Sequence, residues 1–364
     1  LAGRVGLAPG CGVLPLTLLK PSMRILGISA FYHDSAAALL EDGRVLAAAE
    51  EERFSRQKHD NAFPLRAVRS CLDVAGMGTS GLDAVAYYEK PLLKFERLLA
   101  SFVETYPRSL GPFVRAIPEW LGRKIQVERL IRKELGYRGE VFFIPHHVSH
   151  AAAAFYPSPF AEAAILTVDG IGEYQTTGLW HGDGTAIHAV ARIDFPHSLG
   201  LLYAAFTAFL GFRVNDDEYK VMGLAAYGQP TYADAIRRIV DVRDDGSFRL
   251  DMRCFAFRER FHMWNRRFEA LFGPPRRPGA PITGRDQNLA ASIQAVTEDI
   301  YLNMLNHLHD LTGSPNVCIA GGVALNAVAN GKIYGKTPFK NAYVFGPAGD
   351  SGAALGAALF AHHG

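Results

Sequence analysis

The chain has 364 residues, 49% of them hydrophobic and 20% charged, which is the balance of a globular protein that buries a core without disulfide staples. A formal net charge of +2 and the lack of an apolar run long enough to span a bilayer give no reason to expect nucleic-acid or membrane partners. Four cysteines without a CxxC pair indicate neither a disulfide framework nor a thiolate zinc site, and they fit a cytoplasmic location.

The first 22 residues precede a methionine, Met23, and contain a short apolar stretch that Pro15 interrupts. This stretch is a poor fit to a signal peptide, which needs a longer uninterrupted apolar region. We therefore interpret residues 1–22 as an upstream extension and expect the fold to begin at Met23.

The first predicted lobe spans residues 23–160 and opens with three short strands. The turn Glu41-Asp42-Gly43 is a hairpin signal between the second and third of them. Strands are predicted at 24–30, 35–40, 44–49, 83–88 and 140–144, and helices at 64–76, 92–105 and 125–136. Short antiparallel strands followed by helices indicate an α/β unit.

The second predicted lobe, residues 161–364, repeats this plan. The repeat is inferred from pattern, because the two halves share negligible identity. Strands are predicted at 163–168, 174–181, 185–193, 317–320 and 341–345, and helices at 323–333 and 352–361. The segment 198–315 has a mostly helical pattern, interrupted by an arginine- and proline-rich stretch from Arg253 to Arg285.

Two histidines begin an alanine-rich segment after the strand at 140–144. His146 and His150 are four residues apart, so a helix places them on one face, close enough to share a metal ion. The glutamate of the metallopeptidase motif is missing beside the first histidine. The alternative is a helix start whose histidines are only hydrogen-bonded.

A glycine-rich turn follows the strand at 341–345 and places Asp350 before a helix of small residues. This position suits a carboxylate that caps a helix N-terminus. Asp350 is alternatively the third member of a two-histidine, one-carboxylate site, an arrangement that favours Fe(II) without excluding zinc or manganese.

Two further turns are candidates for nucleotide binding. Their residues are Asp169, Gly170 and Gly172 in the first turn, and Gly321, Gly322 and Asn326 in the second. Backbone amides in the first turn form an anion-binding nest, although an Asp-Gly pair is also an ordinary hairpin turn. The second turn ends a buried strand and starts a helix, which suits an anion or a planar base, or merely a tight connection.

The N-terminal segment carries one more polar cluster. His33 and Asp34 lie between the first two strands, and residues 50–59 run from three glutamates to Arg56 and Lys58. Charge runs are usually solvated, but here both signs stand near a strand end, where open α/β sites form. An acidic segment at 215–218 indicates little on its own.

Together these motifs make the chain similar to the O-carbamoyltransferases of antibiotic and nodulation-factor biosynthesis. The opening MRILGISAFYHDSAAALLEDGRVLAAAEEERFSRQKH resembles the start of that family. The HxxxH helix, EYKVMGLAAYG, GGVALN and GPAGDSGAALGAA follow in the family's order, so the resemblance covers roughly residues 23–362.

The resemblance implies an α/β fold with a duplicated actin/sugar-kinase/Hsp70-like (ribonuclease H-like) plan and a nucleotide cleft between two lobes. It implies an iron-like metal on His146, His150 and Asp350. It also implies carbamoyl transfer from carbamoyladenylate to a hydroxyl of a sugar-like or natural-product acceptor. A C-terminal domain of the family makes this adenylate from carbamoyl phosphate and ATP. We expect that domain to be missing here, because the chain stops at Gly364.

The resemblance also suggests roles for the other candidates. His33 is expected to act as general base on the acceptor hydroxyl, since an unperturbed histidine titrates near pH ~6.5. Asp34 would orient His33 or bind the acceptor, and Lys58 would stabilise developing negative charge. The nucleotide would be held by Asp169, Gly170, Gly172, Gly321, Gly322 and Asn326.

Three alternatives remain open. One is a kinase or ATPase of the same superfold, which has no need of a histidine pair. Another is a tRNA threonylcarbamoyl transferase, which would favour a basic surface. The stretch Arg253–Arg285 is basic, but we interpret it as a solvated helix and loop or as docking surface for the missing domain. The third is a truncated domain that binds metal and nucleotide without turnover.

Overall fold

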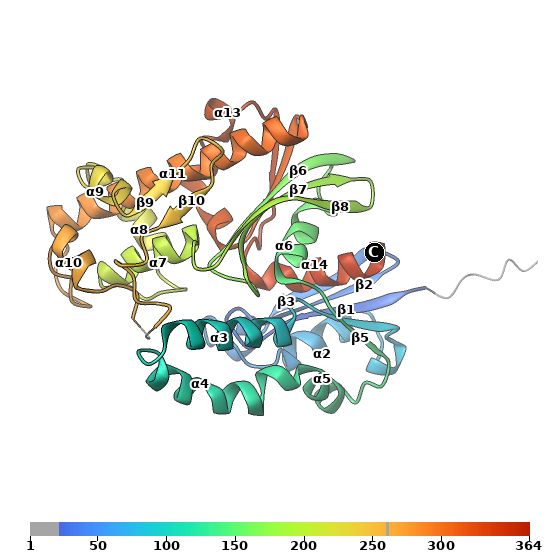
Figure 1. Ribbon diagram of the computed structural model, residues 1–364. Helices are drawn as coiled ribbons and strands as arrows, with labels where there is room; N and C mark the ends of the chain where they lie inside the picture. The colour runs from blue at the N-terminus through green and yellow to red at the C-terminus, as the bar shows by residue number, and fades with distance from the viewer. Residues whose placement is uncertain (1–21, 260–261) are drawn as a thin grey trace, which may run out of the picture.

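The computed structural model describes residues 22–259 and 262–364, which form two five-stranded sheets, a small hairpin and the helices around them (Figure 1). The extension expected at residues 1–22 lies outside the described residues, except for Ser22. Within the described part, no helix is long and apolar enough to cross a membrane.

The first sheet contains the three strands that open the chain and two strands that follow them. Its order is β3-β2-β1-β4-β5, with β1, β2 and β3 antiparallel and β4 and β5 parallel to β1. The strands are β1 (Arg24–Ser29), β2 (Ala36–Glu41), β3 (Arg44–Glu50), β4 (Ala84–Tyr87) and β5 (Glu140–Phe143). Asp42 and Gly43 both have positive φ, as the predicted two-residue hairpin turn requires.

The second sheet repeats the first strand for strand. Its order, read from the other edge, is β8-β7-β6-β11-β12, again with three antiparallel and two parallel strands. The strands are β6 (Glu162–Val168), β7 (Gln175–Asp183), β8 (Ala186–Asp194), β11 (Asn316–Ala320) and β12 (Asn341–Val344). This duplication confirms the predicted two-lobed α/β fold of the actin, sugar-kinase and Hsp70 type.

The first lobe has six α-helices and two 3₁₀ turns among its described residues. They are α1 (Glu52–Ser55), α2 (Leu65–Val74), η1 (Thr79–Gly81), α3 (Pro91–Thr105), α4 (Leu110–Gly122), η2 (Lys124–Gln126), α5 (Val127–Leu135) and α6 (His146–Phe155). The sequence did not predict α4. Pro112 and Pro118 indicate chain breaks there, and although the segment has an apolar face, none of this helix's residues, all of them described, is buried.

The second lobe has a larger helical part. Its further elements are α7 (Leu199–Phe209), α8 (Glu218–Ala225), α9 (Ala233–Arg237), β9 (Val240–Val242), β10 (Phe248–Leu250), α10 (Arg266–Phe272), α11 (Gly284–Thr312), η3 (Gly322–Leu325), α12 (Ala327–Asn330), α13 (Ile333–Lys336) and α14 (Asp350–His363). The hairpin β9–β10 replaces part of the helical segment expected there, since three-residue strands are too short to show alternation. The single helix expected at 323–333 is split, because Asn326 caps α12 and Gly331 ends it.

The arginine-rich stretch is only partly the solvated segment that its charge suggested, because several of its arginines are exposed but its aromatic side chains are buried; its role as a docking surface stays a prediction. Trp264, Phe268 and Phe272 are buried, and their rings pack against Phe206 and Phe209 of α7. The arginines alternate with these aromatic side chains, so the described part of the stretch covers the core of the second lobe with its charges outward.

The last helix of each lobe packs against the sheet of the other lobe. Helix α6 adds Ala151, Ala154 and Phe155 to a buried cluster formed by β6, β7 and β11. Helix α14, which follows β12, adds Ala353 and Leu359 to the core of the first sheet. Figure 1 shows the two helices side by side between the sheets. Both helices therefore begin near the centre of the molecule.

Small residues allow the two exchanged helices to approach each other closely. A Cβ added to Gly356 of α14 would overlap the carbonyl oxygen of Ser149 in α6. Gly27 of β1 makes the equivalent approach to the backbone of α14 at Ala354. The spacing between α6 and α14, and hence between their first residues, depends on Gly356, and Gly27 sets how closely α14 approaches the first sheet.

We predict that Gly356→Ala lowers the free energy of unfolding by about 1–3 kcal/mol, because the added methyl group forces α14 away from α6. The control is Gly335→Ala in α13, where an added Cβ meets nothing within 4 Å. Chemical denaturation measures both. Equal stability of the two variants would contradict the close packing.

Candidate functional site

The histidine pair lies at the start of α6, buried between the lobes. His146 is 1% exposed and His150 is 0% exposed. Their Nε2 atoms are 3.1 Å apart, as the predicted i, i+4 spacing on one helix face requires. The carboxylate of Glu173 accepts the backbone N–H of His146 at 3.0 Å and so caps the helix at this point.

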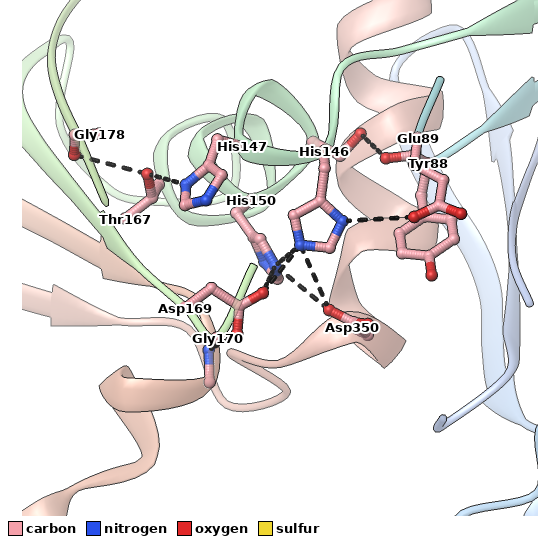
Figure 2. Close-up of polar contacts among 12 residues, drawn as sticks. Tyr88, Glu89, His146, His147, His150, Thr167, Asp169, Gly170, Gly178 and Asp350 are labelled. Atoms are coloured by element: carbon pink, nitrogen blue, oxygen red, sulfur yellow. Dashed lines mark hydrogen bonds and ion pairs between the residues drawn. The ribbon is translucent and has the colours of Figure 1, made fainter. Parts of the chain in front are cut away.

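Two carboxylates approach the histidine pair from the second lobe, and Figure 2 shows all four side chains converging. Asp169 follows β6, and its Oδ2 lies 2.8 Å from His146 Nε2 and 3.5 Å from His150 Nε2. Asp350 begins α14, and its Oδ1 lies 3.6 Å and 3.4 Å from the same two nitrogens. We name these four residues the histidine–carboxylate cluster.

The histidine–carboxylate cluster fits a divalent cation. Its four ligand atoms lie within 4.8 Å of one another. Metal–ligand bonds of about 2.1 Å at ordinary angles place neighbouring donors roughly 3.0–3.4 Å apart, close to the separations above. Among the described residues, both oxygens of Asp350 are buried without a hydrogen-bond partner, which is unfavourable for a carboxylate unless a cation compensates it. Imidazole and carboxylate donors suit iron, zinc and manganese.

Proton equilibria within the cluster follow its charge. Burial disfavours the charged form of His150, but the carboxylates of Asp169 and Asp350 outweigh it and raise the pKa of His150 to about 9. Burial opposes ionisation of Asp169 as well, yet the two histidines hold the pKa of this carboxyl well below its usual range. The pocket therefore stabilises positive charge between two carboxylates, which is what a cation supplies.

His147 faces away from the cluster. Its Nδ1 lies 2.8 Å from the hydroxyl of Thr167 in β6. Burial, together with the neighbouring His146 and His150, lowers the pKa of His147 well below its ordinary value. His147 is thus a neutral, packed side chain, whereas His146 and His150 point into the cluster.

A cavity of about 320 Å³ borders the cluster and is lined by both lobes. The predicted residues in its wall are His33, Asp34, Lys58, Asp169, Gly170, Gly322 and Asn326. The amide of Gly322 donates to Asp169 Oδ1 at 3.1 Å, which links the two glycine turns. Gly172 and Gly321 lie behind the wall: a Cβ on Gly172 would sit 3.1 Å from His146 and His147, and Gly321 has a φ of 92° against the backbone of Val168.

His33 lies between the cavity and the cluster. Its Nδ1 is 2.9 Å from Asp34 Oδ2, and its Nε2 is 3.8 Å from Asp350 Oδ2. Burial disfavours the charged ring, but the carboxylates of Asp350 and Asp34 outweigh it and raise the pKa of His33 to about 9. A cation bound beside Asp350 would offset this carboxylate and lower the pKa of His33 again.

Lys58 is exposed at the cavity wall, with 55% of its side chain accessible. Its ammonium pairs with Asp216, from the loop before α8. Hydrogen bonding to Asp216 raises the pKa of Lys58 above its usual value. Lys58 thus lines the same cavity as His33 and forms an ion pair with a carboxylate of the other lobe.

Sequence reasoning did not foresee four of the partners in this region. Asp169 was assigned to the nucleotide, whereas the structure places it beside the histidines. No role was predicted for Glu173, His59 or Asp216. The signal for Asp169 was its place at the end of β6, the strand equivalent to β1. The contacts of His59 and Asp216 join residues 157 positions apart, which no local pattern shows.

The duplicated fold and the cluster at the crossing of its exchanged helices define the class: a two-lobed α/β protein with a candidate metal centre in its cleft. Comparison with known proteins names the family. A profile described as "Carbamoyltransferase N-terminus" matches residues 24–359, and the chain belongs to this family. The family prediction made from the motifs is confirmed.

Relatives extend beyond this chain. An uncharacterized protein of Synechocystis sp. is 48% identical over 349 residues, which cover 93% of this chain and 57% of that protein. The nodulation protein NolNO of Sinorhizobium fredii is 37% identical over 345 residues, covering 91% and 46%. This chain thus spans about half the length of the curated relatives it matches. Among solved structures, component A of (R)-2-hydroxyglutaryl-CoA dehydratase from Acidaminococcus fermentans covers 94% of this chain and 98% of its own, with 14% identity and a TM-score of 0.46.

We predict that His146→Ala and Asp350→Ala each weaken metal binding by about tenfold or more, because each removes a donor from the cluster. Metal content of the purified protein measures the effect. The matched control is His147→Asn, which alters the neighbouring histidine without touching a donor. Equal metal loss in all three variants would contradict the ligand assignment.

Asp169→Ala separates two roles for this residue. As a metal donor, its loss lowers metal content as much as the loss of Asp350 does. A carboxylate that serves the nucleotide alone would leave metal content unchanged and weaken nucleotide binding. The same metal analysis, with a nucleotide titration beside it, distinguishes the two outcomes.

Proposed function

We propose that this chain is the acceptor-modifying part of an O-carbamoyltransferase, which moves a carbamoyl group from carbamoyladenylate to a hydroxyl of a sugar-like or natural-product acceptor. Membership of the carbamoyltransferase family supports the group that is transferred. The observation that carries the proposal is the position of His33. Its ring lines the cavity and lies 3.8 Å from Asp350 of the cluster, so a base and a candidate metal centre face one substrate space.

The donor is the part of the proposal that depends on the longer relatives. Carbamoyladenylate would be made from carbamoyl phosphate and ATP by a C-terminal adenylate-forming domain. Because this chain spans only about half of its curated relatives, the remainder has room for such a domain. In this scheme the chain described here needs the adenylate supplied to it.

The cation in the proposal is Fe(II), with zinc or manganese as substitutes. His146, His150 and Asp350 would hold it, with Asp169 as a fourth donor. When bound, such a cation acts as a Lewis acid that offsets negative charge on the donor's phosphate. Asp169, Gly170, Gly322 and Asn326 line the cavity beside it and would hold the nucleotide, with Gly172 and Gly321 shaping the two turns from behind.

The protein's own residues then perform the proton transfer. His33 donates a hydrogen bond from its Nδ1–H to Asp34, so Nε2 is free to accept the proton of the acceptor hydroxyl. The acceptor oxygen forms a bond to the carbamoyl carbon. The bond from that carbon to the phosphate oxygen breaks, and AMP leaves with the electron pair. Lys58 is proposed to stabilise the developing negative charge from the cavity wall.

Carbamoyl transfer from supplied carbamoyladenylate to a panel of amino-sugar and polyol acceptors tests the proposal, with the added group read by mass. We expect transfer by the native protein and a loss of kcat of about 10²–10⁴-fold in His33→Ala, the range for removal of a general base. The control is His188→Ala, an exposed histidine on β8.

Three outcomes of this assay favour other functions. Hydrolysis of ATP or phosphoryl transfer, with no carbamoylated product and no metal, points to the kinase or ATPase alternative. Tight binding of metal and adenylate without transfer to any acceptor points to a binding domain without turnover. Modification of tRNA, in place of small hydroxyl acceptors, identifies a threonylcarbamoyl-type enzyme.

A further inference from the structure

We propose that His59 is a positioning residue that holds Asp34, and through Asp34 the ring of His33, by tying both to Asp216 of the second lobe. The inference rests on the proposed function, because it assigns His33 the proton transfer. It adds His59 of the first lobe and Asp216 of the second lobe to the residues that support the proton transfer.

A continuous row of polar contacts joins His59 to both aspartates and to His33. His59 Nε2 lies 2.9 Å from Asp216 Oδ1, and His59 Nδ1 lies 2.6 Å from Asp34 Oδ1. The other oxygen of Asp34, Oδ2, lies 2.9 Å from His33 Nδ1. Two carboxylates and two imidazoles thus alternate from the cavity mouth to the ring that faces Asp350.

His59 is held at its backbone as well as at its ring. Its N–H donates to Glu52 Oε2 at 2.8 Å. Its φ is 54° and that of Asp34 is 52°, so both residues adopt the left-handed conformation that non-glycine residues rarely take. Such strained backbone persists where surrounding contacts over-determine it, and it gathers at functional sites.

Asp216 anchors the row to the second lobe. It lies in the loop between α7 and α8, where Asn215 also has a positive φ of 62°. Only 9% of its side chain is exposed, and it receives Lys58 and Arg213 in addition to His59. The row of contacts therefore completes only when the two lobes are in the relative position seen here.

The consequence concerns the ring of His33. Each oxygen of Asp34 has one histidine partner, so the carboxylate cannot rotate without breaking a contact. A fixed Asp34 selects the His33 tautomer with its proton on Nδ1 and leaves Nε2 toward the substrate space. The side chain of Asp34 is 26% exposed in the structure. Without His59 it would keep one partner and be free to turn toward water.

Two substitutions separate this role from a general structural one. The amide nitrogen of asparagine falls near the position of histidine Nδ1, and that of glutamine falls near Nε2. His59→Asn therefore keeps the contact to Asp34 and loses Asp216, whereas His59→Gln does the reverse. The control is His181→Gln: this ring is 30% exposed, close to the 28% of His59, and pairs with Glu162 far from the cavity.

We expect His59→Gln to lower kcat for carbamoyl transfer by about 10- to 100-fold, the scale of a misplaced reacting group, with acceptor KM within about threefold. His59→Asn should recover part of this loss, because it keeps the contact to Asp34 and loses only the anchor at Asp216, and His181→Gln should match the native protein. Metal content and melting temperature should stay unchanged in all three, because His59 is not in the histidine–carboxylate cluster.

Three results would overturn the inference. They are equal kcat in His59→Gln and the native protein, equal loss in the asparagine and glutamine variants, and a loss that tracks a lowered melting temperature. Asp34, Glu52 and His59 also lie close enough together to hold a cation, so loss of a second metal from the His59 variants would show a metal site in place of a positioning contact.

Absence of carbamoyl transfer in the native protein would reject the proposed function while leaving the contact row testable. In that case the ¹⁵N spectrum of the His33 ring is measured on zinc-loaded protein. We expect the Nδ1–H tautomer in the native protein and in His59→Asn, and a mixture in His59→Gln. Identical spectra in all three would overturn the positioning role independently of activity.

Discussion

The concentration of carboxylate and imidazole groups at the centre of the molecule is the constraint on which the remaining arrangement depends. Asp350 is buried with both oxygens unpartnered among the described residues, and Asp169 is largely buried beside it. Two such groups repel each other in a medium of low polarity unless positive charge lies between them. Packing alone therefore does not explain the cluster, and the elements around it hold its side chains in place.

The fold meets this constraint through duplication. Each lobe ends in a helix that crosses to the other sheet, so the first residues of α6 and α14 meet at one point. Strand β6 ends at the same place and brings Asp169. The four candidate donors thus come from three regular elements or their ends, whose positions are set by sheet register and glycine contacts. The residues proposed for proton transfer, in contrast, stand on loops, where cross-lobe contacts replace secondary structure as the source of rigidity.

Local signals explain what the sequence could predict. Strand patterns, the hairpin at Asp42-Gly43 and the four-residue spacing of His146 and His150 are short-range features, and the structure agrees with them. Three features depend on tertiary context instead: α4 has no buried face, Asp169 joins donors from other elements, and His59 pairs across the lobes. The burial of Trp264 and Phe268 within the arginine-rich stretch depends on tertiary context as well, because their charged neighbours give the segment the local pattern of a solvated one.

The exchange of helices has a consequence for biosynthesis. The first sheet exposes the apolar face that α14 covers, including Ile25 and Leu40 on the side of Gly27, until a helix roughly 300 residues later in the chain has left the ribosome. Asp350 arrives with that helix, so the cluster cannot be complete on a partly made chain. Any ion that it binds is captured after synthesis of the second lobe. A nascent chain would depend on chaperones or on rapid translation to shield the incomplete cluster.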